Sequence, residues 1–158
     1  MAFETVQIVP MGAITDVYTD LTKYRLGQRV RDEKGNEFIF LQGVASTVAG
    51  DPVVFDGAYA TTRLAGTLAG DVAIAMAAIV ANKYGFYQVY GNGSANVVAT
   101  GGVRVYGSTV TGQLTATVVT GALIHGMYTV PGNGNTVTGT LTTVRMAYPS
   151  VDRASGSY

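Results

Sequence analysis

The single histidine of the chain, His125, is the first residue to test for chemistry, because imidazole serves as a general base and as a metal ligand. A Ser-His-Asp relay needs an activated serine, and no serine here lies in a G-x-S-x-G turn. A zinc site needs several nitrogen or sulfur ligands, and the chain has no cysteine. The neighbouring residues, LIHGMY, resemble a strand. We therefore interpret His125 as structural and expect no catalytic residue, no metal site and no enzymatic activity.

Two groups of acidic residues are candidates for acid-base or cation-binding chemistry. Asp32, Glu33 and Glu37 lie close together in DEKGNE, a turn sequence. A glycosidase needs two carboxylates that face each other across a cleft, one with a pKa raised by burial, and a solvated turn provides neither. Asp16 and Asp20 flank VYT, but two carboxylates without further oxygen ligands make a poor calcium site. We interpret all five as solvated acids.

Two glycine-rich stretches resemble phosphate-binding loops. GNGSAN (91–96) lacks the third glycine of a dinucleotide fingerprint and the helix that should follow it, and PGNGN (131–135) lacks a lysine. Gly and Asn readily adopt positive φ. We therefore predict hairpin turns at both places, the first at Asn92-Gly93, and no bound cofactor.

The stretch KYGFYQVYG is rich in aromatic residues. In a strand, Tyr84, Phe86 and Tyr90 share one face with Gln88, while Tyr87 lies on the other. Such a face can be a stacking platform for sugars or bases, or it can belong to the core or a subunit interface. The scarcity of amide and charged neighbours favours the second interpretation. We expect one face to lie in the core and the other near the surface or a subunit contact.

The composition limits the classes of partner. The chain has 158 residues, enough for one domain, and only 13% are charged, with a net charge of zero. The absence of a basic cluster argues against nucleic-acid binding. No secretion signal begins the sequence, and the longest apolar run, 72–81, is too short to span a bilayer. We expect a soluble protein, made in a cytoplasm, without membrane contact.

Charge is also unevenly distributed along the chain. Residues 1–40 include eleven charged side chains, whereas residues 84–144 include one, Arg104. Low charge suits a protein that packs against others, and equally a small β-protein that uses Thr and Ser as its polar face.

The elements that would position these residues are mostly strands. Residues 24–42 predict a hairpin with its turn at Gly35-Asn36. Residues 49–57 predict a turn and a short strand, with Pro52 at its start or on an edge. Residues 71–83 fit a strand with one bulge or a buried helix, and the strand-like flanks favour the strand.

From Tyr84 onwards, turn signals recur every eight to twelve residues, which is typical of an antiparallel sandwich or barrel. We therefore predict an all-β fold, an antiparallel β-barrel or sandwich of short strands, with a short helix as the alternative for 71–83. Residues 1–24 form an N-terminal arm and an irregular lead-in. Residues 25–150 form the β-rich domain, with two packed sheets (25–95 and 96–150) as an option, and residues 151–158 form a flexible tail.

Three segments carry a family resemblance: LGQRVRDEKGNEFIFLQGVAS (26–46), AGDPVVFD (49–56) and AGDVAIAMAAIVANKYGFYQVYGNGSA (69–95). In this order they resemble the small capsid decoration (cement) proteins of tailed bacteriophages. The resemblance covers roughly residues 25–95, and residues 96–158 match no pattern of that family.

The resemblance implies a β-rich virion protein, commonly a homotrimer, that binds across neighbouring major capsid protein subunits on the outer capsid surface and stabilises the shell. Met1–Pro10 is the segment expected to add a strand to a neighbour. The expected interaction residues are Phe3, Val6, Ile8, Val9, Tyr84, Phe86 and Tyr90. A phage tail or fibre component, and a carbohydrate-binding β-module that uses the Tyr84/Phe86/Tyr90 face, are the alternatives.

Overall fold

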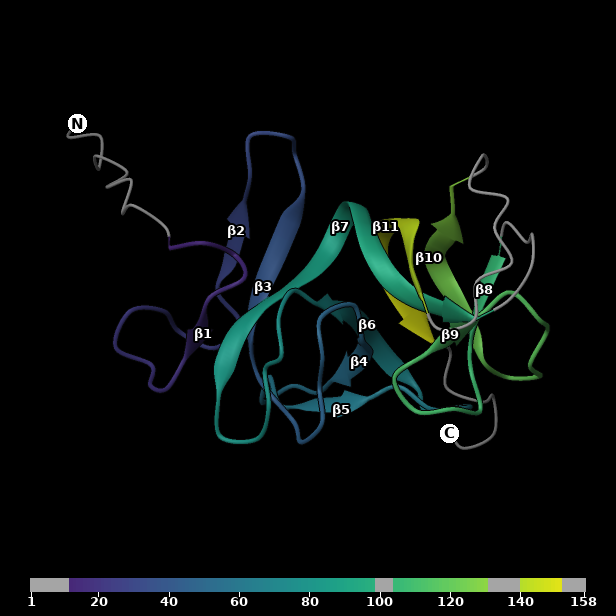
Figure 1. Ribbon diagram of the computed structural model, residues 1–158, viewed down its shortest axis with the longest axis horizontal. Coiled ribbons are helices and arrows are strands. Elements are labelled where there is room, and N and C mark those ends of the chain that lie inside the picture. Colours follow the sequence, from purple (N-terminus) through teal and green to yellow (C-terminus); the bar gives the residue numbers. More distant parts are fainter. Residues whose placement is uncertain (1–11, 99–103, 131–139, 152–158) are drawn as a thin grey trace.

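The computed structural model describes residues 12–98, 104–130 and 140–151, which form an all-β fold without a helix (Figure 1). No helical segment capable of crossing a lipid bilayer occurs in these three ranges. The strands are β1 (Val17–Tyr18), β2 (Arg29–Arg31), β3 (Glu37–Gln42), β4 (Pro52–Phe55), β5 (Thr61–Arg63), β6 (Gly70–Ala75), β7 (Tyr84–Val98), β8 (Arg104–Gly107), β9 (Leu114–Thr115), β10 (Leu123–Thr129) and β11 (Thr140–Val151).

The strands form a barrel with extra strands bonded outside it. Hydrogen-bonded ladders lead from β7 to β9, β8, β10, β11 and back to β7, which closes the circuit. β6 pairs with both β7 and β11. β4 pairs with β6, and β5 pairs with β4 at the edge of the sheet. The hairpin β2–β3 and the short β1 attach to the first half of β7. The predicted all-β barrel class is therefore confirmed.

β7 connects the two parts of the molecule and runs across Figure 1 as one long curved ribbon. Its first half pairs with β3, where Phe40 faces Phe86, and its second half pairs with β11, where Val144 faces Gly93. The predicted hairpin turn at Asn92-Gly93 is therefore wrong. The boundary proposed between residues 95 and 96 also lies inside this strand.

The glycines of this stretch permit close packing instead of a reversal of the chain. Gly91 has φ 96° and bends the strand, and a Cβ there would overlap the side chain of Asn36. A Cβ at Gly93 would overlap Gln88, which is buried, and crowd Met146. Glycine at these two positions lets neighbouring side chains pack against the β7 backbone.

Residues 71–83 contain a strand, as favoured, but the predicted bulge is wrong. β6 ends at Ala75, and the chain then bends. Ile79 lies beyond the strand and is nevertheless completely buried. Its side chain occupies the space where a Cβ on Gly85 would lie. The change in the alternation of large and small apolar residues therefore marks the end of the strand. A loop residue such as Ile79 can pack into the core without following that alternation.

The hairpin and the Pro52 strand are confirmed with small differences in their bounds. The first hairpin strand begins at Arg29, and Gly35 has φ 83° in the turn. Asp32 stabilises that turn, since its Oδ1 accepts hydrogen bonds from the backbone N–H groups of Lys34 and Asn36. Pro52 is the first residue of β4, where the missing N–H is tolerated.

Buried apolar side chains form three clusters. The largest lies inside the barrel and includes Val97, Ile124 and Met146. The other two lie on opposite faces of β3 and the first half of β7: Tyr87 belongs to one, and Phe86 to the other. The Tyr87 face lies in the core, as expected of one face. The other face is not uniformly near the surface or a subunit contact, because Phe86 is completely buried whereas Tyr90 is exposed.

Candidate functional site

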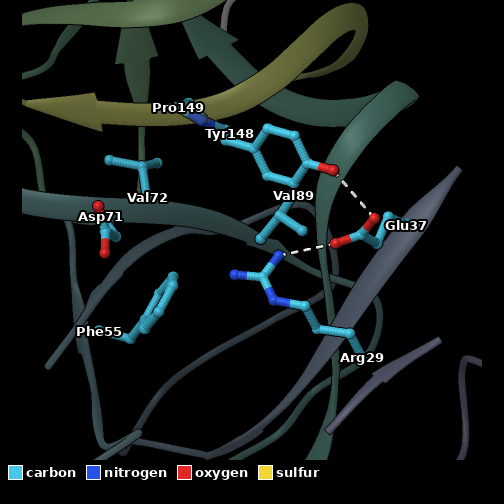
Figure 2. A pocket seen from close by; sticks show the side chains of 8 residues that line it. All are labelled: Arg29, Glu37, Phe55, Asp71, Val72, Val89, Tyr148 and Pro149. Carbon is cyan, nitrogen blue, oxygen red and sulfur yellow. Dashed lines mark hydrogen bonds and ion pairs between the residues drawn. The ribbon is translucent and has the colours of Figure 1, made fainter. Parts of the chain in front are cut away.

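A cleft of about 410 Å³ lies where the hairpin β2–β3 meets β11 and the start of β6 (Figure 2). We call it the Arg29 cleft. Six strands contribute to it, and its lining residues are Arg29, Glu37, Phe55, Asp71, Val72, Val89, Tyr148 and Pro149. A volume of this size falls in the range of small-molecule sites.

Glu37 is the buried charge at the side of the cleft. One carboxylate oxygen accepts a hydrogen bond from Arg29 at 2.8 Å, and the other accepts from Arg31 Nε and from the Tyr148 hydroxyl, each at 3.0 Å. Burial raises the pKa of a carboxyl group, but the hydrogen bonds from Arg29, Arg31 and Tyr148 outweigh it and hold the pKa of Glu37 below its ordinary value. The expectation that Glu37 is a solvated turn acid is therefore wrong.

Strand geometry places the two arginines beside Glu37. Arg29 and Arg31 are two residues apart and therefore lie on one face of β2. The ladder sets Arg31 directly opposite Glu37 in β3. The register against β7 shifts between Glu37 and Phe38, so Glu37 departs from the alternation of the rest of β3.

Tyr148 closes the cleft from the distant β11. Its φ of 50° is unusual for a residue with a Cβ, and such strain costs on the order of 1 kcal/mol or more. The Arg29 guanidinium lies 5.6 Å from its ring centroid, and the ring of Tyr90 lies 5.3 Å away. These contacts and the bond to Glu37 hold the side chain in place. Sequence patterns did not single out Tyr148, since Arg29 and Glu37 lie more than a hundred residues away from it in the chain.

Two charged groups face the open part of the cleft. Figure 2 shows the Arg29 guanidinium with Glu37 on one side and Phe55 and Asp71 on the other. Among the described residues, the Asp71 carboxylate has no hydrogen-bond or ion-pair partner, and Arg29 donates only to Glu37. A neighbouring hollow of about 610 Å³ shares Arg29, Phe55 and Asp71, so the recess continues along the surface.

The expected interaction residues are dispersed. Phe86 is completely buried, Tyr84 is half-buried against Phe40, and Tyr90 is 37% exposed beside Tyr148. These three do not form one exposed face. Phe3, Val6, Ile8 and Val9 lie outside the described residues. His125 occupies an exposed position of β10, as a strand residue, beside a second hollow that includes Arg104 and Tyr128.

The acidic side chains of the described residues are dispersed or already hydrogen-bonded. Within the three described ranges, no three His, Asp or Glu side chains come together as a metal site. Asp20 binds the backbone N–H and hydroxyl of Thr22 and thus has a local structural role. Glu37 has a lowered pKa and three donors on its oxygens, so it is a poor proton acceptor. The arrangement of the Arg29 cleft is suited to binding.

Comparisons with family models, with curated proteins and with solved structures gave no match to this chain.

Proposed function

We propose that this chain is a non-enzymatic virion structural protein that decorates a bacteriophage capsid and stabilises it by binding across neighbouring major capsid protein subunits. The observation that carries the proposal is the exposure of apolar side chains on the low-charge part of the barrel. Val118 is 72% exposed and Val110 is 55% exposed, and both lie in the connections that flank β9. Leu141 on β11 is 54% exposed.

This surface fits a protein that is covered by others. Single exposed apolar residues are ordinary, but here they occur in a region, residues 84–144, whose only Lys, Arg, Asp or Glu is Arg104. Interface centres are depleted in charge, because burying charged groups costs desolvation energy. The resemblance of residues 25–95 to capsid decoration proteins supports the same function and adds the expectation of a homotrimer.

The proposal is tested by mixing the purified chain with assembled heads of the tailed bacteriophage whose genome encodes it. We expect co-sedimentation with the heads and an oligomer in sedimentation velocity. Val118→Asp should weaken both, since it places a carboxylate in an apolar contact, whereas Thr120→Asp at another exposed position of the same loop should change neither. A monodisperse monomer that does not bind heads would disprove the proposal.

A further inference from the structure

The Arg29 cleft presents a donor and an acceptor that are both free for a ligand. A guanidinium group has five N–H donors, and in the described structure Arg29 donates only to Glu37. Asp71 is exposed, and its carboxylate accepts no hydrogen bond from any described residue. Both side chains line the same cleft, and in Figure 2 the Arg29 guanidinium extends toward the side on which Asp71 lies. A ligand there can accept from Arg29 and donate to Asp71 at once.

The charges of the cleft select against ligands with one strong charge. A cation drawn to Asp71 lies close to the Arg29 guanidinium, and an anion drawn to Arg29 meets the carboxylates of Asp71 and Glu37, so either ligand meets repulsion as well as attraction. A neutral ligand with several hydroxyl groups avoids the repulsion, because each hydroxyl both donates and accepts.

The walls of the cleft add apolar contact area. Phe55 lies beside the open space, and the half-exposed ring of Tyr148 forms the rim. Aromatic rings bury large apolar areas with a fixed geometry, and they pack well against the C–H faces of sugar rings. Tyr148 is held in position by its bond to Glu37 despite its positive φ, so this wall is preorganised.

An extended peptide fits the cleft less well. Peptides bind sheets by adding a strand to an open edge. At Asp71 both edges of β6 are occupied, since Phe55 of β4 pairs on one side and Ser150 of β11 on the other. The donors and acceptors that remain come from side chains, which suits a ligand rich in hydroxyls.

We propose that the Arg29 cleft binds a neutral saccharide, with Arg29 and Asp71 hydrogen-bonding its hydroxyls and Phe55 and Tyr148 packing against its rings. This site differs from the Tyr84/Phe86/Tyr90 face considered from the sequence, and the proposal does not depend on the capsid function. A saccharide site in the Arg29 cleft is compatible with capsid decoration and with other functions.

The test is an NMR titration of the full chain with maltotriose, cellotriose and N-acetylchitotriose, with trilysine and trigalacturonate as charged probes. We expect at least one neutral trisaccharide to shift the resonances of Arg29, Asp71 and Tyr148. Asp71→Ala should weaken that binding about tenfold, and Asp71→Asn should weaken it less. Glu33→Ala, which removes an exposed carboxylate from the hairpin turn, should leave the affinity unchanged.

The spectrum of each variant also reports whether it is folded. The proposal is overturned if no neutral trisaccharide binds at about 10 mM, or if binding persists at wild-type affinity in folded Asp71→Ala. It is also overturned if only trilysine or only trigalacturonate shifts the cleft resonances, because the site would then select charge.

Discussion

Glu37 is a buried carboxylate that stays ionised because three side chains donate to it. Arg29 and Arg31 come from the adjacent strand, whereas Tyr148 comes from the last strand of the described chain. Through Glu37, the side chains of the hairpin β2–β3 are therefore linked to Tyr148 on β11 of the barrel. Because breaking a buried pair leaves unpaired groups, its loss costs more than the loss of a surface ion pair.

We predict that Glu37→Gln lowers the free energy of unfolding at pH 7 by about 1–3 kcal/mol, since hydrogen bonds to a charged group are lost. The pKa of Glu37 is lower in the folded state than in the unfolded state, so its stabilisation is complete above the unfolded-state pKa of about 4.3. It disappears as the pH falls through the folded-state pKa. Urea unfolding of wild type and variant at pH 7 and at pH 2–3 measures the difference.

The control for this prediction is Glu33→Gln, an exposed position on the turn between β2 and β3. Its difference from wild type should stay within about 0.5 kcal/mol at both pH values. A Glu37→Gln difference that is equally large at pH 7 and at pH 2–3 would contradict the role of the ionised carboxylate.

At the scale of elements, β7 determines how the outer strands and the barrel are joined. It pairs with β3 and β6 in its first half and with β11 and β9 in its second. Gly91 lies near the change of partners and has φ 96°. The bend at this residue lets one strand serve both parts without a turn.

We predict that Gly91→Ala destabilises the protein by about 1–3 kcal/mol, because alanine is strained at this φ and its Cβ would overlap Asn36. Gly35→Ala is the matched control: φ is 83°, but no atom lies within 4 Å of the added Cβ. The free energy of unfolding should fall less in Gly35→Ala, since this substitution adds backbone strain but no overlap. Denaturant unfolding of both variants gives the comparison, and equal losses would show that the close approach at Gly91 does not matter.

At the scale of the whole molecule, the ladders make one sheet of all the strands. The buried clusters that contain Ile39 and Ile124 lie in different parts of the fold, and β7 contributes side chains to both. A division into independent units at residue 95 would break β7 in the middle of its ladder with β11. The described residues are therefore expected to unfold together.

We predict that Ile39→Ala and Ile124→Ala each lower the free energy of unfolding by about 2–5 kcal/mol, as expected for buried side chains that leave cavities. Hydrogen exchange of the slowest amides in β3 and in β10 should accelerate together in both variants. If Ile124→Ala accelerates exchange in β10 but leaves β3 unchanged, the two parts unfold separately and the prediction is wrong.

The local patterns determined the strand class, the hairpin and the start of β4, because alternation, turn residues and proline act over a few neighbouring positions. They did not determine the course of β7, since Asn-Gly is compatible with a turn and with a bent strand, and only the pairing with β11 decides between them. Nor did they reveal the Arg29 cleft. Arg29 and Glu37 belong to the predicted hairpin, but Asp71 and Tyr148 are distant from it in the chain, and only the pairing of the strands in the folded sheet brings all four to one cleft.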